Sequence, residues 1–352
     1  MAMTRRNFIK TMCLAGVALL LKGCTRVDEP SRDLEPWQPA YAKLEAEGRL
    51  AKRIEQAYGI LEKCELCPNR CGANRRKGQR GFCRAPEKAM VYSYHPHFGE
   101  ELPLVGQGGS GTIFFSNCNL RCVFCQNWPI AHEGLGHEVS DEELADMMLD
   151  LQGIGCHNIN LVTPTHVMPN IVNATRIALK KGLQLPLCYN TSGYEFAKNI
   201  KLLDDIVDIY LPDLKFMDDA EASRYNYATA SDYPEMAQKS IIEMHRQVGD
   251  LVTDESGIAL RGLMVRHLVM PNQVAGTRKF VKWVAENLST GTYVNIMAQY
   301  RVEHRAFEYE RIARGITAEE FVAAMEWAIE AGLTNLDERS VAHLEIARRM
   351  IS

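Results

Sequence analysis

The chain of 352 residues carries little net charge, because 40 lysine and arginine residues are balanced by 44 aspartate and glutamate residues, leaving a formal charge of -4. The basic residues are dispersed along the sequence rather than gathered into one stripe. Nucleic-acid-binding domains usually concentrate their basic residues on one face. The charge pattern therefore gives no support for a nucleic-acid partner, without excluding one.

The N-terminal segment lacks an apolar run long enough to cross a membrane. Its apolar stretch, Thr11–Leu21, is about eleven residues long, whereas a spanning helix needs ~20. That length is typical of the apolar region of a signal peptide, and Arg5-Arg6 just before it resembles a twin-arginine export signal. We therefore expect residues 1–24 to be a signal or anchor, and the protein to be associated with the cell envelope or membrane.

The end of this segment, Leu21-Lys22-Gly23-Cys24, resembles a lipoprotein cleavage box, although Lys22 stands where a small residue is usual. Lipidation at Cys24 would tether the protein through its N-terminus. The alternative is a chance Arg-Arg pair before an uncleaved segment, which would leave the protein in the cytoplasm.

The eleven cysteines do not have the scattered spacing of a disulfide framework. Seven of them fall into two groups with the short spacings of metal ligands. The upstream group is Cys64, Cys67, Cys71 and Cys83, and the downstream group is Cys118, Cys122 and Cys125.

The downstream group lacks a fourth cysteine, which is its most informative property. Three thiolates can hold three irons of a cubane cluster, whereas a closed electron-transfer cluster takes four cysteines. The spacing CxxxCxxC, directly after the apolar run Gly111–Phe115, therefore predicts a cluster with one open iron. The alternative is a zinc site or three unrelated buried cysteines.

The upstream group has the four thiolates that would complete a tetrahedral zinc site or a closed iron–sulfur cluster. Gly78 and Gly81 would let the intervening loop turn back, so that Cys83 meets the other three. Zinc, a structural role and a second redox cluster all remain open.

Apolar runs of strand length alternate with helical patterns from Gly111 onward, which predicts a parallel sheet covered by helices. The runs are Gly111–Phe115, Asn158–Val162, Leu185–Tyr189, Ile206–Leu211, Gly262–Val269 and Thr292–Met297. Ser140 with Glu143, and Thr317 with Glu320, have capping-box spacing and predict two helix starts. We expect the helix after Thr317 to cover the open edge of the sheet, and an earlier helix to span Tyr41–Leu61.

Polar residues follow the ends of these strands. Ligand sites of such folds lie at the carboxyl ends of the strands, which would bring these residues to one rim. They are Thr163–His166, Asn190–Tyr194, Asp213–Lys215, Arg266-His267 and Ala298–Arg301.

The cysteine loop, with Phe124 before its last cysteine and Asn127 two residues after it, resembles the cluster loop of radical S-adenosylmethionine (SAM) enzymes. The order cysteine loop, Asn-Thr-Ser-Gly, Asp-Leu-Lys and Val-Arg-His-Leu-Val-Met-Pro resembles the pyruvate formate-lyase activating enzymes and their uncharacterised relatives. The resemblance covers about Gly108 to Gln299.

The resemblance implies an α/β fold, an incomplete (β/α)6 radical SAM barrel with an N-terminal four-cysteine segment and C-terminal helices. It implies a [4Fe-4S] cluster on the three downstream cysteines, and SAM that is cleaved reductively to a 5'-deoxyadenosyl radical for hydrogen abstraction. The residues expected to contact SAM or its surroundings are Phe124, Asn127, Asn190, Ser192, Asp213, Lys215 and Arg266. No catalytic residue is expected beyond the cluster and SAM.

The implied partners are a low-potential electron donor and a protein or small-molecule substrate, with a glycyl-radical protein suggested by the nearest family. Two features depart from that family. The Gly-Gly-Glu that usually binds the SAM amino group is replaced by Thr163–His166, and the four-cysteine segment precedes the cluster loop, as fits the uncharacterised relatives.

Two other functions compete with the radical enzyme. One is an exported iron–sulfur or zinc protein for electron transfer or assembly, and the other is transferase chemistry without radicals, which would need no open iron. Outside the site, His166, His267, Cys156 and Cys188 are expected to be ordinary buried residues. The expected segments are 1–24 signal or anchor, 25–61 linker and helix, 62–95 metal-binding segment, 108–300 radical SAM core and 301–352 C-terminal helices.

Overall fold

The structure is a computed structural model that describes residues 37–226 and 230–351. The expected signal at 1–24, with Cys24, lies outside the described residues. Gln38–Ser352 form one compact unit. In its described part, no helix is both long and apolar enough to cross a membrane.

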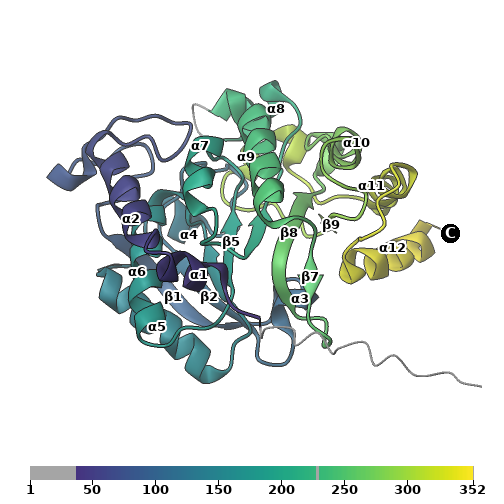
Figure 1. Cartoon of the computed structure of the whole chain (residues 1–352). Helices are drawn as coiled ribbons and strands as arrows, with labels where there is room; N and C mark the ends of the chain where they lie inside the picture. Colours follow the sequence, from purple (N-terminus) through teal and green to yellow (C-terminus); the bar gives the residue numbers. More distant parts are fainter. Residues whose placement is uncertain (1–36, 227–229, 352) are drawn as a thin grey trace, which may run out of the picture. The chain divides into compact units, whose positions relative to one another are not determined.

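Six parallel strands form the centre of the protein (Figure 1). They are β2 (Ser110–Phe115), β4 (Ile159–Val162), β5 (Leu187–Thr191), β6 (Ile209–Pro212), β8 (Ala259–Leu268) and β9 (Tyr293–Met297). Each pairs in parallel with the next of the series. All six predicted strand regions are therefore present, and the expected α/β fold with a barrel-like parallel sheet is confirmed.

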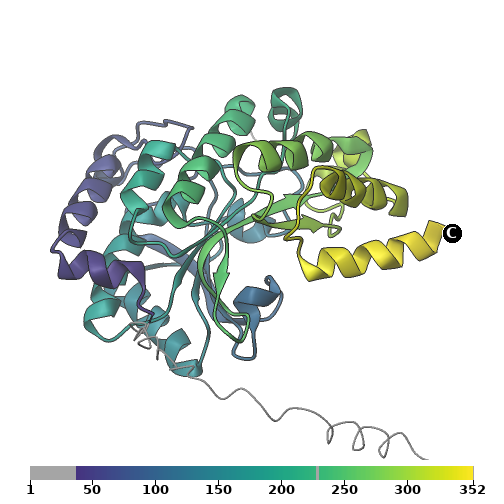
Figure 2. The same cartoon turned by 45° about the vertical axis from the view of Figure 1, so that its right-hand side comes forward.

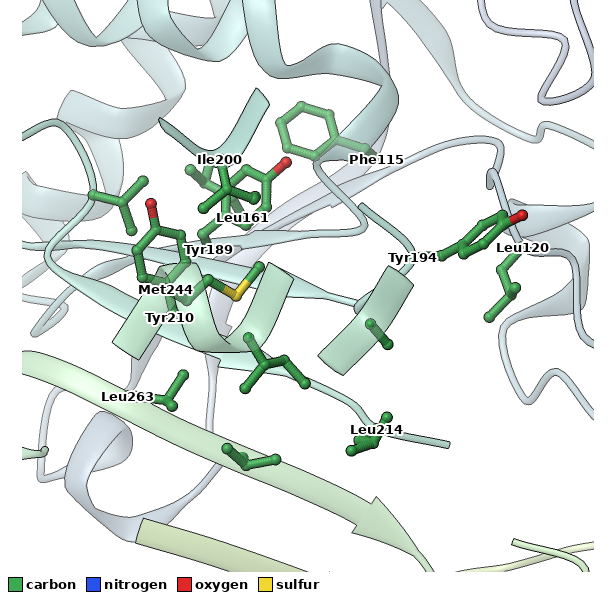
Figure 3. Packing of buried hydrophobic residues seen from close by; sticks show 14 of the residues in the cluster. Phe115, Leu120, Leu161, Tyr189, Tyr194, Ile200, Tyr210, Leu214, Met244 and Leu263 are labelled. Atoms are coloured by element: carbon green, nitrogen blue, oxygen red, sulfur yellow. The ribbon is translucent and has the colours of Figure 1, made fainter. Parts of the chain in front are cut away.

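The strands are apolar because both faces of the sheet are covered. Figure 3 shows the packing of Leu161, Tyr189, Tyr210 and Leu263 from neighbouring strands, with Met244 of α9 (Tyr233–Val248). All five side chains are buried. Burial of this apolar surface is the main stabilising contribution to the sheet.

Eleven further helices accompany α9 in the described residues. They are α1 (Ala40–Ala46), α2 (Leu50–Gly59), α3 (Leu102–Val105), α4 (Trp128–Ala131), α5 (Asp141–Ile154), α6 (Met168–Lys180), α7 (Ala197–Ile200), α8 (Asp219–Tyr225), α10 (Thr277–Asn287), α11 (Ala318–Glu330) and α12 (Glu338–Ile351). The capping boxes of α5 and α11 form as predicted. Helices α5 and α6 lie side by side, and α2 packs against α6 (Figures 1 and 2).

The predicted helix Tyr41–Leu61 is wrong, because the chain divides there into α1 and α2. Gly48 lies between the two helices with φ of +71°, a left-handed conformation that ends a helix. The turn gives the segment two short helices, both of which contact α6.

The predicted cover of the open sheet edge is also corrected, because α12 rather than α11 packs on β9 (Figure 2). The Ser340 hydroxyl of α12 donates to the Ile296 carbonyl of β9 at 2.9 Å. Helix α11 packs between α10 and α12. A side chain of α12 thus satisfies a backbone acceptor of the last strand.

Three strands lie outside the predicted series. Strand β1 (Ala89–His97) pairs antiparallel with β2 and with β3 (His137–Val139), and β7 (Val252–Thr253) pairs antiparallel with β8. Between β1 and β2, α3 places Leu104 in a small apolar cluster with Cys188 and Met264. Cys188 is fully buried and Cys156 nearly so, as expected for small apolar residues.

We predict that Gly262→Ala destabilises the fold much more than Gly257→Ala. Both glycines have positive φ, +131° and +81°, so both substitutions strain the backbone. A Cβ on Gly257 meets open space, whereas one on Gly262 would lie 2.5 Å from the Leu251 Cα and 2.6 Å from the Asp250 oxygen. We expect Gly257→Ala to lower the free energy of unfolding by roughly 1–2 kcal/mol. Gly262→Ala should lower it by clearly more. Urea denaturation measures both, and equal losses would contradict the close packing of β8.

Candidate active site

The three downstream cysteines lie on a tight loop after β2. Asn117 and Arg121 adopt left-handed conformations, with φ of +75° and +53°, which turn the chain on either side of Cys118. The Val123 amide donates to the Tyr225 carbonyl at 2.9 Å and fixes the loop against α8. The loop is therefore held at the carboxyl end of the sheet, where ligand sites are expected.

A cavity of about 270 Å³ opens beside this loop. All ten residues assigned from the sequence to the cluster and SAM line it. They are Cys118, Cys122, Cys125, Phe124, Asn127, Asn190, Ser192, Asp213, Lys215 and Arg266. The structure thus brings the ten residues together, while their individual contacts with cofactors stay predictions.

A half-buried carboxylate, Asp213, organises the charges of the cavity. Lys215 Nζ lies 2.5 Å from Asp213 Oδ2, and Arg266 Nε lies 2.8 Å from Oδ1. Burial alone would raise the pKa of Asp213, but the two cations outweigh it and the pKa is lowered. Arg266 also donates from Nη2 to Asn190 Oδ1 at 2.6 Å. The two cations are therefore held in place before any ligand binds.

Two thiols of the loop, Cys122 and Cys125, are difficult to ionise without a metal. Burial raises the pKa of Cys122 well above its usual range and that of Cys125 to about 12, while Lys215 opposes both shifts. A metal must therefore displace these protons when it binds. The Leu120 amide donates to Cys118 Sγ at 3.3 Å, which supports sulfur as a ligand.

The donor set fits an iron–sulfur cluster. In the described part of the chain, no three Cys, His, Asp or Glu side chains converge on one metal-ion position. A cubane takes one thiolate per iron, so its ligands stand at separate corners. Three thiols at one cavity wall, with Lys215 nearby to balance negative charge, suit that geometry.

Only one residue of the turn after β4 reaches the cavity. Thr163 lines it, with φ of +61°. Thr165 is buried and donates to Glu195 Oε1 at 2.6 Å. His166 is buried with Nε2 2.7 Å from the Ser116 carbonyl, and burial lowers its pKa to about 4, helped by Arg75. His166 is therefore an ordinary buried residue, as the sequence analysis expected.

His267 is likewise an internal structural residue. Nδ1 lies 2.6 Å from the Leu214 carbonyl, Nε2 lies 3.0 Å from the Thr277 hydroxyl, and the ring stacks on Phe280. Burial lowers its pKa to about 4, so the ring is neutral near pH 7. His267 fixes the strand that presents Arg266 but does not line the cavity.

Two carboxylates that the sequence analysis missed lie beside the cavity. Glu100 Oε2 is 3.3 Å from Arg266 Nη1, and burial raises the pKa of Glu100 to about 7 despite that arginine. Glu101 Oε1 accepts from Asn295 Nδ2 at 2.9 Å. Both residues directly precede α3 and do not follow a strand of the parallel series. A Glu-Glu pair at such a position carries no sequence signal for a ligand site. They line a second space that continues from the first past Arg266 and Asn190.

Fold and cavity together define a parallel-sheet protein with a three-cysteine cluster loop at its strand ends. The radical SAM superfamily matches residues 112–255. An uncharacterised protein of Methanocaldococcus jannaschii is 32% identical over 285 residues, which cover 78% of this chain and 77% of that protein. The chain belongs to the radical SAM superfamily.

Membership of this superfamily implies an enzyme with a [4Fe-4S] cluster and SAM as cofactors. Among solved structures, the chain is similar to methylornithine synthase, with 16% identity and a TM-score of 0.39. That similarity covers 64% of this chain and 69% of the synthase.

We predict that Glu195→Gln removes a pH dependence of stability. Glu195 follows the β5 turn and accepts from Thr165, Thr191 and Tyr189, and its burial raises its pKa to about 7. The folded state therefore holds this proton more tightly than the unfolded state, whose carboxyl has a pKa near 4.3. The bound proton therefore contributes its whole stabilising free energy to the folded state below about pH 4, and this contribution is lost as the pH rises to about 7.

As the pH rises across that range, the free energy of unfolding of Glu195→Gln should increase relative to that of the wild type by up to roughly 3 kcal/mol. Urea midpoints at several pH values measure the difference, with the exposed Glu55→Gln as control. Parallel curves for wild type and Glu195→Gln would show that Glu195 is ionised in the folded protein.

Proposed function

We propose that the protein cleaves SAM reductively at this cavity and uses the resulting radical to abstract hydrogen from a substrate. The observation that carries the proposal is the meeting of the three loop thiols with Lys215 and Arg266 in one cavity. When bound, the cluster and SAM would supply the electron and the 5'-deoxyadenosyl group. The protein's own task is to bind and orient them.

The cavity residues suit a zwitterionic ligand with a sugar. Lys215 and Arg266 carry positive charge toward a carboxylate, and Asp213 keeps both cations in place. The Ser192 hydroxyl is buried in the cavity wall and has no hydrogen-bond partner among the described residues. A ligand hydroxyl or carboxylate would satisfy it.

The substrate of this proposal is a glycine in a partner protein, by similarity of motifs to the pyruvate formate-lyase activating enzymes. Asn190 to Gly193, Asp213 to Lys215 and Arg266 carry that similarity. The cavity is lined by Asn190, Thr191, Ser192, Asp213, Lys215 and Arg266 of these segments. A low-potential electron donor is the second partner. A small-molecule substrate would use the space lined by Glu100 and Glu101 instead.

An electron-transfer or assembly protein without SAM turnover is the second candidate. One observation favours it, because the turn after β4 offers the cavity only Thr163 in place of the expected ligand for the SAM amino group. The retained pair Lys215 and Arg266 favours the enzyme.

We predict that the anaerobically reconstituted, dithionite-reduced protein converts SAM to 5'-deoxyadenosine. Cys122→Ala should abolish the product, because an iron of the cluster loses its thiolate. Lys215→Met should lower it at least tenfold while the cluster remains, because the ligand carboxylate loses a charge partner. Chromatography measures the product, and iron analysis with visible absorption reports cluster content.

Cys156→Ala is the matched control, since Cys156 is buried and does not line the cavity. It should retain the wild-type yield. Absence of product from fully loaded wild-type protein would reject the enzyme and favour electron transfer. If 5'-deoxyadenosine forms but no added glycyl-radical protein acquires a radical, SAM cleavage stands and only the proposed glycyl-radical substrate is rejected.

We also propose that residues 1–24 direct the chain to the membrane or envelope, with lipidation at Cys24 as the means of attachment. Arg5 and Arg6 carry this proposal. Changing both to lysine should move the full-length protein into the soluble fraction or block its processing, and Cys24→Ala should remove lipid alone. An unchanged distribution of the double variant would favour a cytoplasmic protein.

A further inference from the structure

The four upstream cysteines come together between α2 and β1. The Cys64 amide donates to the Ala73 carbonyl at 3.0 Å, and the Gly72 amide donates to the Cys64 carbonyl at 3.0 Å, so the chain doubles back within this segment. A Cβ on Gly81 would lie 2.2 Å from Cys71 Sγ, which places the loop leading to Cys83 against that sulfur. Across this turn Cys64 lies near each of the other three cysteines.

The thiols are arranged to accept hydrogen bonds. The backbone amides of Leu66, Asn69 and Ala85 donate toward Cys64, Cys67 and Cys83, each two residues upstream. The Asn69 side-chain amide adds a contact of 3.6 Å to Cys67 Sγ. The downstream loop has the same arrangement, with the Leu120 amide on Cys118 and the Asn127 amide on Cys125. Amides directed at sulfur stabilise thiolates that hold a cluster.

A buried arginine provides a second, independent observation. Arg75 is 1% exposed, and its guanidinium donates to the carbonyls of Pro86 at 2.9 Å and His166 at 2.6 Å. It also lies beside Cys64 and Cys83. In the described residues no carboxylate forms an ion pair with Arg75. A buried cation needs a compensating anion, which a metal centre with four thiolates would provide.

The upstream segment touches the downstream loop. Asn69 donates from Nδ2 to the carbonyl of Asn119 at 2.6 Å, and Asn119 directly follows Cys118. Cys67 is buried beside this contact, whereas Cys71 is exposed. A group held by the four cysteines would therefore have one edge toward solvent and another toward the three-cysteine loop.

We propose that the four upstream cysteines hold a second, closed iron–sulfur cluster that receives electrons for the adjacent site. Four thiols with backbone amides directed at three of the sulfurs, beside a buried cation, suit a closed cluster. In each transfer a one-electron donor of low potential is oxidised by one electron and the cluster is reduced by one electron. The cluster then returns to its oxidised state by passing that electron toward the Cys118 loop. No bond is made or broken in this transfer, and its purpose rests on the proposed function.

The first test uses the full chain with Cys118, Cys122 and Cys125 all changed to alanine. After anaerobic reconstitution it should retain about four irons per chain and give an electron paramagnetic resonance signal on reduction with dithionite. Adding Cys67→Ala and Cys83→Ala should remove both. Zinc in place of iron, or no metal in the folded triple variant, would overturn the proposal. Circular dichroism verifies folding of each variant.

The second test measures the reduction potential of this cluster in the triple-alanine background. Arg75→Met should shift the potential to a more negative value, because loss of a nearby positive charge disfavours the reduced, more negative cluster. Arg75→Lys should restore part of the shift. Arg80→Met is the matched control, because Arg80 lies on the same loop but is exposed, and it should change the potential little. Equal shifts for Arg75→Met and Arg80→Met would contradict Arg75 as the buried counter-ion.

The relay is tested separately from SAM cleavage. In otherwise unmodified protein, Cys67→Ala with Cys83→Ala should slow reduction of the downstream cluster by reduced flavodoxin at least tenfold, followed by stopped-flow absorbance. Unchanged reduction would reject the relay. If the second cluster is present and reducible but wild-type protein makes no 5'-deoxyadenosine, the proposed function fails while the cluster stands.

Discussion

The cavity depends on the pairing of opposite charges away from solvent. Asp213 lies at the centre of these charges, with Lys215 on one carboxylate oxygen and Arg266 on the other. Isolated charges are costly in a protein interior, but a carboxylate with two cations and good hydrogen bonds is tolerated. The backbone around Asp213 is tightly held, because the Tyr233 hydroxyl shares its one proton between the Ser192 and Asp213 carbonyls and accepts from the Lys215 amide. Gly193 belongs to this arrangement, since a Cβ there would lie 2.5 Å from the Asp213 carbonyl oxygen.

The same compensation recurs at the two cysteine groups. Burial raises the pKa of Cys64, Cys67 and Cys83 in the upstream group and of Cys122 and Cys125 in the downstream group. A cation lies beside each group to favour the thiolate, Lys215 near Cys122 and Arg75 near Cys64. Each cation is fixed by other contacts, Lys215 by Asp213 and Arg75 by backbone carbonyls. The positive charge is therefore in position before any negative group binds, which avoids reorganisation on loading.

Sequence reasoning succeeded where a signal is local and failed where contacts join distant segments. The six strands and the three-cysteine loop have short-range patterns, and the carboxyl-end rule brings Asn190, Lys215 and Arg266 together without knowledge of the packing. The antiparallel strands β1 and β3 have mixed burial that lacks the continuous apolar pattern of the core. The pairing of Glu100 with Arg266 joins residues 166 positions apart, and no local pattern encodes it.

The turn after β4 shows how a departure from a family motif changes the chemistry of a rim. His166 and Thr165 are directed inward by their hydrogen bonds to Ser116 and Glu195, so the turn presents only Thr163 to the cavity. Thr163 is β-branched and has φ of +61°, a conformation that such residues rarely adopt because of steric crowding. Its amide donates to the Asn190 carbonyl at 2.9 Å, which ties the strained residue to the neighbouring strand end. Strain of this kind persists only where surrounding contacts impose it. At this position the cavity wall is therefore built from constrained backbone and one hydroxyl, and an ammonium group bound there would meet neutral oxygens instead of a carboxylate.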